Sequence, residues 1–151
     1  MTISLPATTD EQVAQFQAEY SAAFGGSNQE ELESAKCRLI WALAHHTASR
    51  AHLQRGLDLA EAALGGDART ADQDRELKYL SAVAMYNLRS YIAARRALAD
   101  LLADYPDFRQ AQALYDEVNE LVIRDGLLGL GMVASVVGLG VGLLAAAGRR
   151  R

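Results

Sequence analysis

The apolar residues ahead of position 126 recur at helical spacing. Between Val13 and Phe24 the large apolar side chains are separated by three, four and four residues, which places them on one face of an α-helix. Similar spacing recurs further along, and no stretch alternates apolar and polar residues as a half-buried strand does. The pattern therefore predicts an all-α fold with six helices, near residues 10–24, 29–47, 50–65, 71–88, 91–104 and 108–124.

Local signals mark where these helices start and stop. The pairs Gly25–Gly26 and Gly65–Gly66 fall between predicted helices, where glycine is typical of loops. Three helices are predicted to open with a capping box, in which Thr or Ser precedes Gln or Glu by three residues: Thr9 with Gln12, Ser27 with Glu30, and Thr70 with Gln73. These signals agree with the boundaries that the apolar spacing predicts.

The stretch from Lys78 to Pro106 resembles one tetratricopeptide (TPR) repeat, a helix–turn–helix unit of about 34 residues. Ala82 and Ala94 stand at the two small positions where the paired helices of such a repeat cross. Tyr91 stands at the usual aromatic position of the second helix, whereas a lysine, Lys78, replaces the early tryptophan of the repeat. This stretch predicts one helix pair of the TPR type.

An earlier helix pair, at residues 39–64, is predicted to be a degenerate copy of the same unit, with Gly56 in place of Ala94. Two repeats cannot cover their own apolar ends. The helices near residues 10–24 and 107–124 are therefore expected to act as caps. The prediction is a six-helix TPR-like bundle, made of two TPR-like helix pairs with capping helices.

Residues 126–148 carry no charged side chain. As a helix this stretch would be about 35 Å long, enough to cross a hydrocarbon layer of about 30 Å. A buried core helix is the alternative, but the apolarity on all sides and the basic residues that follow favour a C-terminal transmembrane helix. The chain then divides into an N-terminal arm and first helix at 1–27, a cytosolic TPR-like domain at 28–125, a transmembrane tail anchor at 126–148 and a short basic tail at 149–151.

Two features of this tail indicate how it acts in the lipid bilayer. A Gly/Ala-rich span followed by Arg149, Arg150 and Arg151 is typical of tail anchors directed to the mitochondrial outer membrane or to peroxisomes. Small residues recur at every fourth position, which permits close approach of two helices. This stripe indicates either a homo-oligomer in the membrane or a chance pattern, and it consists of Ala134, Gly138, Gly142 and Ala146.

Charge and composition exclude several functions. Three of the 15 basic residues lie at positions 149–151, so the rest of the chain has 12 basic against 19 acidic residues. Such a domain repels phosphate backbones, and no nucleic-acid partner is expected. The carboxylates are scattered and no phosphate-binding loop is present, so neither an enzyme nor a cofactor is predicted. Cys37 is expected to be a partly buried helix residue without special reactivity.

The three histidines give a weak hint of a metal site. His45, His46 and His52 lie close together in sequence, but no acidic or cysteine ligand stands at a convincing spacing from them. We therefore expect surface or loop histidines and no metal.

Several segments in a fixed order carry a wider resemblance: Arg38–Leu43, Gln54–Gly56, Tyr79–Val83 with Tyr86 and Tyr91, Pro106–Ala111 and Arg124–Gly129. In this order the chain from Lys36 to Arg151 resembles the mitochondrial fission 1 protein family, closest to its plant and algal members. The resemblance implies an adaptor on the cytosolic face of mitochondria and peroxisomes, which helps recruit a dynamin-related GTPase directly or through another adaptor. The alternative is a tail-anchored TPR receptor for protein import or organelle quality control.

TPR bundles bind partners on a concave face lined by the first helix of each repeat. An apolar groove with a few polar groups suits an amphipathic helix or an extended peptide. The alternative for the aliphatic members of this set is a plain core role. By the register above, the groove residues are predicted to be Leu39, Leu43 and His46 in the first repeat and Tyr79, Val83, Tyr86 and Asn87 in the second.

Overall fold

The computed structural model describes residues 3–66 and 69–126, and these form an all-α fold. The described helices are α1 (Asp10–Phe24), α2 (Gln29–Ala44), α3 (Arg50–Leu64), α4 (Ala71–Asn87), α5 (Tyr91–Asp104) and a sixth helix at residues 109–126. The six predicted helices are confirmed, with one clear difference in length. The second ends at Ala44 rather than near residue 47, because the chain turns at His45.

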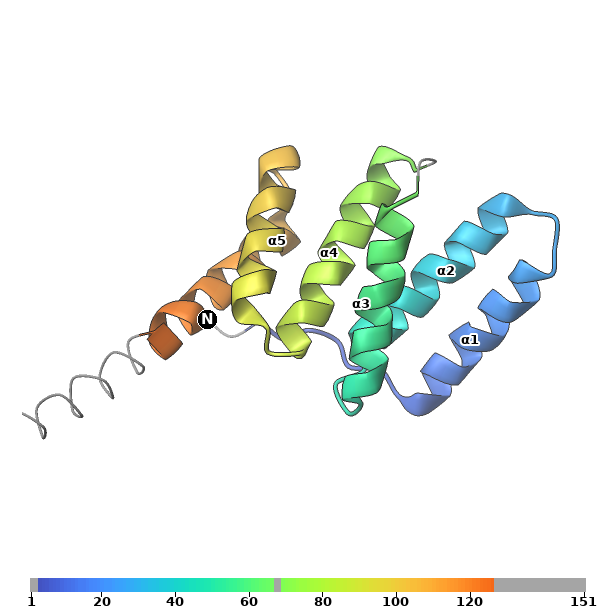
Figure 1. Ribbon diagram of the computed structural model, residues 1–151, viewed down its shortest axis with the longest axis horizontal. Coiled ribbons are helices and arrows are strands. Elements are labelled where there is room, and N and C mark those ends of the chain that lie inside the picture. The colour runs from blue at the N-terminus through green and yellow to red at the C-terminus, as the bar shows by residue number, and fades with distance from the viewer. Residues whose placement is uncertain (1–2, 67–68, 127–151) are drawn as a thin grey trace, which may run out of the picture.

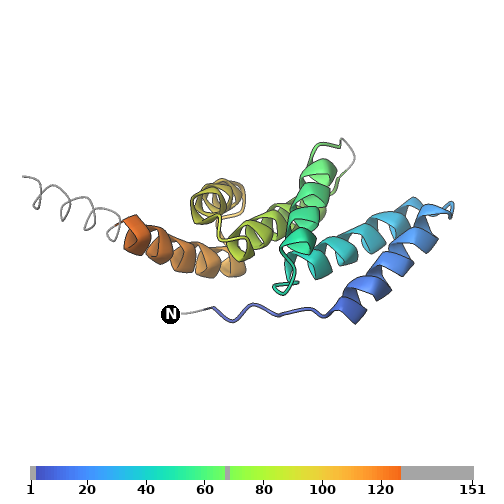
Figure 2. The same ribbon diagram turned by 60° about the horizontal axis from the view of Figure 1, so that its bottom comes forward.

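The helices follow one another across the molecule in chain order (Figure 1). α2 packs against both α1 and α3, and α4 packs against both α3 and α5. Ahead of α1, residues 3–9 form an extended N-terminal segment that runs back along the array toward the sixth helix (Figures 1 and 2). The first and last parts of the described chain are therefore close in space.

Small residues let neighbouring helices approach closely, as the repeat pattern predicts. Ala82 and Ala94 are both fully buried and belong to one apolar cluster with Leu98 and Leu114. Gly56 occupies the matching position between α2 and α3, where a β-carbon would lie only 3.0 Å from the backbone nitrogen of Ala44. Lys78, in place of the repeat's tryptophan, contacts Asp74 and Asp104 at 2.8 Å each and so links α4 to the end of α5.

Two of the three predicted capping boxes are confirmed. Thr9 and Thr70 each accept a hydrogen bond from the backbone N–H three residues later, and the side-chain oxygen of the glutamine there accepts one from the threonine's own backbone N–H. The third differs from the prediction by one residue, because Asn28 rather than Ser27 caps α2. The Asn28 side-chain oxygen accepts from the backbone N–H groups of both Glu30 and Glu31, which satisfies two amides that the helix itself cannot.

The predicted transmembrane span begins at the last described residue, Gly126. Among residues 3–66 and 69–126, no helix combines the length and apolarity needed to cross a bilayer. The small-residue stripe (Ala134, Gly138, Gly142 and Ala146) and the basic tail (Arg149, Arg150 and Arg151) lie outside the described residues. The anchor therefore stays a prediction.

Candidate partner-binding groove

A cleft of about 530 Å³ lies between α2, α4, the start of the sixth helix and the N-terminal segment. α4 contributes Arg75 and Tyr79 from adjacent turns of one face, and Phe108 comes from the residue just before the sixth helix. Trp41 of α2 completes the aromatic lining. Three helices that are separate in sequence thus form one concave site.

Aromatic contacts fix the wall of this cleft. The rings of Tyr79 and Phe108 lie 5.2 Å apart between centroids, and the Arg75 guanidinium carbon lies 5.5 Å from the centre of the Phe108 ring. Such separations are typical of tilted aromatic pairs and of cation–π contacts. Burial raises the pKa of the Tyr79 phenol, so this group stays a neutral hydroxyl. This part of the wall therefore offers aromatic surface beside a hydroxyl and a cation, and the carboxylates of Asp72 and Glu76 line the same cleft.

The N-terminal segment lies along the cleft as an extended chain. Thr8 holds it in place: its Oγ1 donates to the Ala42 carbonyl at 2.6 Å, and its backbone N–H donates to the His45 carbonyl at 3.1 Å. These carbonyls belong to the end of α2, where a helix leaves acceptors without intrahelical partners. Ile3 and Leu5 pack against the apolar core and line the cleft. The N-terminal segment therefore forms one wall of the cleft.

Tyr79 is the predicted groove residue that lines this cleft. Leu39, Leu43 and Val83 are completely buried, so in this conformation their side chains offer a partner no surface. Leu39 and Leu43 pack with Val13 of α1, and Val83 belongs to the cluster around α4 and α5. For these three residues the structure corrects the groove assignment in favour of the core alternative, because α1 and α5 cover them.

The other three predicted residues are not among those that line the cleft. Tyr86 packs against Tyr91 with ring centroids 5.9 Å apart. Asn87 Nδ2 donates to the Ala44 carbonyl at 2.8 Å, which ties the end of α4 to the end of α2. His46 is buried at the turn after α2. These contacts give the three residues structural roles.

Sequence reasoning about the groove missed Trp41, Arg75, Phe108 and the N-terminal segment. Trp41 and Phe108 were both within the segments that carry the family resemblance, and this was the one signal available for them. Arg75 and the segment gave no sequence signal, since only packing brings them to the cleft.

A second cavity, of about 360 Å³, lies on the face formed by α1, α2 and α4, and it contains Cys37. Cys37 is partly buried, as predicted. Burial, followed by the charges of Glu76 and Glu33, raises the pKa of its thiol. A reactive cysteine needs the opposite shift, so this cavity has no activated nucleophile.

The prediction of surface or loop histidines agrees with the place of two of the three in a turn, although neither of these two lies on the surface. His45 and His46 do lie in the turn after α2, but each has only 2% of its surface exposed. His45 Nδ1 lies 2.8 Å from the Trp41 carbonyl oxygen, which makes Nδ1 its protonated nitrogen because a carbonyl can only accept. His46 instead contacts Asp10, a carboxylate that lies far away in sequence.

Comparison with known proteins places this fold among characterised relatives. A family model described as the Fis1 C-terminal tetratricopeptide repeat matches residues 75–127. Mitochondrial fission 1 protein B of Arabidopsis thaliana is 32% identical over 120 residues, which are 78% of this chain and 71% of that protein. Mitochondrial fission 1 protein A of the same plant is 35% identical over 108 residues, or 72% of this chain and 62% of that protein.

Two solved structures share the fold. Yeast Fis1, crystallised in complex with an Mdv1 fragment that contains the N-terminal extension and coiled-coil domains, aligns with a TM-score of 0.66 and 15% identity. The alignment covers 83% of this chain and 99% of that one. Fis1 from Saccharomyces cerevisiae in a separate crystal structure aligns with the same score. The TPR-like bundle that the sequence predicts is thereby confirmed.

Proposed function

We propose that this chain, which belongs to the mitochondrial fission 1 protein family, is a fission adaptor that helps recruit a dynamin-related GTPase, directly or through another adaptor. Family membership and the likeness to a Fis1 crystallised with an Mdv1 fragment support the adaptor role. The observation that carries the mode of binding is the cleft between α2, α4 and the sixth helix, one wall of which is an extended segment of the chain itself.

The partner would contact the helix side chains that line this cleft together with residues 3–6. Tyr79 and Phe108 offer aromatic surface to an apolar side chain, and the guanidinium of Arg75 stands beside them. An extended peptide gains affinity from main-chain hydrogen bonds and specificity from pockets for its side chains. The proposed role of the cleft is to bind a partner, and GTP hydrolysis and the force on the membrane would belong to that partner.

The proposal includes a tail anchor at residues 126–148, which would hold the TPR-like domain on the cytosolic side of the mitochondrial outer membrane and of peroxisomes. Its uncharged length and the basic residues that follow support a single-pass span. The small-residue stripe would allow two copies to associate within the bilayer.

Localisation and organelle shape test the anchor and the fission role together. An N-terminally tagged full-length chain is compared with one truncated after Asp125, and mitochondrial and peroxisomal length is scored in the same cells. We expect the full-length chain on the organelles with altered organelle length, and a diffuse truncated chain. Diffuse full-length protein contradicts the anchor. Correct targeting with unchanged organelle length favours the import or quality-control receptor instead.

A charge reversal in the cleft tests the binding site itself. Arg75→Glu places an acid beside the Phe108 ring, whereas Arg96→Glu makes the same charge change at an exposed position on α5. We expect Arg75→Glu to lower recruitment of the dynamin-related GTPase to mitochondria and Arg96→Glu to leave it unchanged. Equal recruitment by both variants would exclude this cleft as the binding site.

A further inference from the structure

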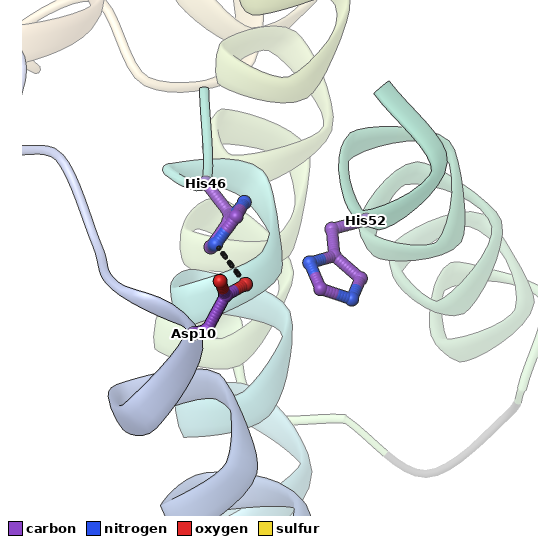
Figure 3. A group of neighbouring side chains, drawn as sticks. All are labelled: Asp10, His46 and His52. Carbon is purple, nitrogen blue, oxygen red and sulfur yellow. Dashed lines mark ion pairs between the residues drawn. The ribbon is translucent and has the colours of Figure 1, made fainter. Parts of the chain in front are cut away.

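Three side chains with metal-ligating atoms meet where α1 begins, α2 ends and α3 begins (Figure 3). Asp10 is the first residue of α1, His46 lies in the turn after α2, and His52 lies in the first turn of α3. Their ligating atoms are all within 4.8 Å of one another. His46 Nε2 lies 2.9 Å from Asp10 Oδ1, and the two imidazole rings are 4.6 Å apart between centroids.

A hydrogen bond between Asp10 and His46 accounts for only part of this arrangement. The Nδ1 atoms of His46 and of His52 are both buried without a hydrogen-bond partner among the described residues. A buried polar atom that lacks a partner costs free energy, so each one calls for an explanation. His52 also turns a ring nitrogen toward the other two side chains (Figure 3). The cluster therefore has more atoms able to ligate a metal ion than its internal contacts use.

We propose that Asp10, His46 and His52 bind one divalent transition-metal ion of the zinc class. Two imidazoles and one carboxylate form a ligand set that zinc accepts, with a fourth position left for water. Imidazole nitrogen favours zinc, cobalt, nickel or copper over magnesium and calcium, which prefer oxygen ligands. The absence of a nearby acidic ligand in sequence argued against a metal, and the fold supplies that ligand from α1.

The geometry needs only a small adjustment. Metal–ligand bonds of about 2.0–2.2 Å in a tetrahedral site place ligand atoms about 3.3–3.6 Å apart. The contact of 2.9 Å would open slightly, and the longest separation, which is at most 4.8 Å, would close by about 1 Å. Asp10 is free to make this movement, because its side chain is 86% exposed, whereas His46 is held in place by burial. The exposure of Asp10 also leaves the fourth position open to solvent.

A metal ion bound here would link three helices. The ion would tie the start of α1 to both ends of the turn between α2 and α3. Thr8, which fixes the N-terminal segment, lies two residues before the proposed ligand Asp10. The site would therefore steady α1 and the segment that lines the cleft, and its role would be structural.

Titration with the metal alone tests the site. The untagged full-length chain in detergent micelles, freed of metal with a chelator, is titrated with Zn²⁺ by calorimetry and with Co²⁺ by visible absorption. We expect one ion per chain and a Co²⁺ absorption spectrum of the kind that a four-coordinate site gives. Asp10→Asn keeps the shape of the side chain and should weaken binding by about tenfold or more, as loss of a supporting group at a metal site already does.

Glu11→Gln is the matched control, since it removes an equal charge from the neighbouring exposed residue of the same helical turn. We expect this variant to bind like the unaltered chain. His52→Asn removes the second imidazole from a half-buried position and should weaken binding as Asp10→Asn does, with helix content checked by circular dichroism. The proposal is overturned if the folded chain binds no Zn²⁺, or if Asp10→Asn and His52→Asn both bind as tightly as Glu11→Gln.

Discussion

Gly56 lies directly against Leu43, so that a β-carbon on Gly56 would be 2.9 Å from the Leu43 β-carbon. This contact sets how closely α2 and α3 approach. Gly56 is buried in the middle of α3 and keeps a normal helical conformation. The lack of room for a side chain, and not the backbone conformation, therefore requires glycine at this position. This close contact decides whether an alanine at position 56 would stabilise or destabilise the domain.

Gly56→Ala is expected to destabilise the helical domain. Helix propensity alone would make alanine more stable by about 1 kcal/mol. Overpacking against Leu43 and the Ala44 backbone costs about 1–3 kcal/mol, because two packed helices must move apart. Chemical denaturation followed by circular dichroism measures the balance. In Gly65→Ala the new β-carbon meets nothing closer than 3.5 Å, so this control should change stability little.

Asn28→Ala is expected to lower the free energy of unfolding by about 1 kcal/mol, since it removes the N-cap of α2. Ser27→Ala, at the position that the sequence pattern favoured, should have almost no effect. Thermal unfolding of the two variants distinguishes the assignments. A larger loss for Ser27→Ala would return the cap to that residue.

Acid is expected to destabilise the domain through His45. Burial lowers the pKa of His45 in the folded state, and the hydrogen bond to Trp41 opposes this only in part. Below the ordinary histidine pKa of about 6.5, this side chain therefore binds more protons in the unfolded chain than in the folded one. The free energy of unfolding falls as the pH drops below that value.

His45→Asn should weaken this pH dependence, because asparagine keeps an N–H donor near the Trp41 carbonyl but does not titrate. Denaturation midpoints measured between pH 5 and pH 8 provide the comparison. An identical slope in the variant would rule out His45 as a source of the acid sensitivity.

Thr8→Val is expected to loosen the N-terminal segment. The variant keeps the size of the side chain but loses the hydrogen bond to the Ala42 carbonyl, a bond worth about 1 kcal/mol. Hydrogen–deuterium exchange of the backbone amide of residue 8, which donates to the His45 carbonyl, should become faster by about fivefold, the ratio that this free energy corresponds to. Thr47→Val, at an exposed position in the nearby turn, serves as the control and should leave exchange unchanged.

The helices of this protein could be predicted from sequence because their signals are local. Apolar spacing and capping residues act within one or two turns, so six helices followed from pattern alone. Even the error at Asn28 was a shift of one residue between two good capping types. The crossing alanines were also predictable, since the repeat fixes their separation along the chain.

Tertiary structure alone decided which side chains a partner could reach. Leu39 and Val83 lie on the helices that the sequence assigns to the groove, yet α1 and α5 cover them completely. Asp10 meets His46 and His52 because α1 packs across the end of α2, a contact between distant residues that no local pattern encodes. The amino-acid sequence by itself determined the helices and the order in which they follow. Packing between helices determined the cleft, the docked N-terminal segment and the histidine cluster, because each requires groups that come together only when apolar faces are buried.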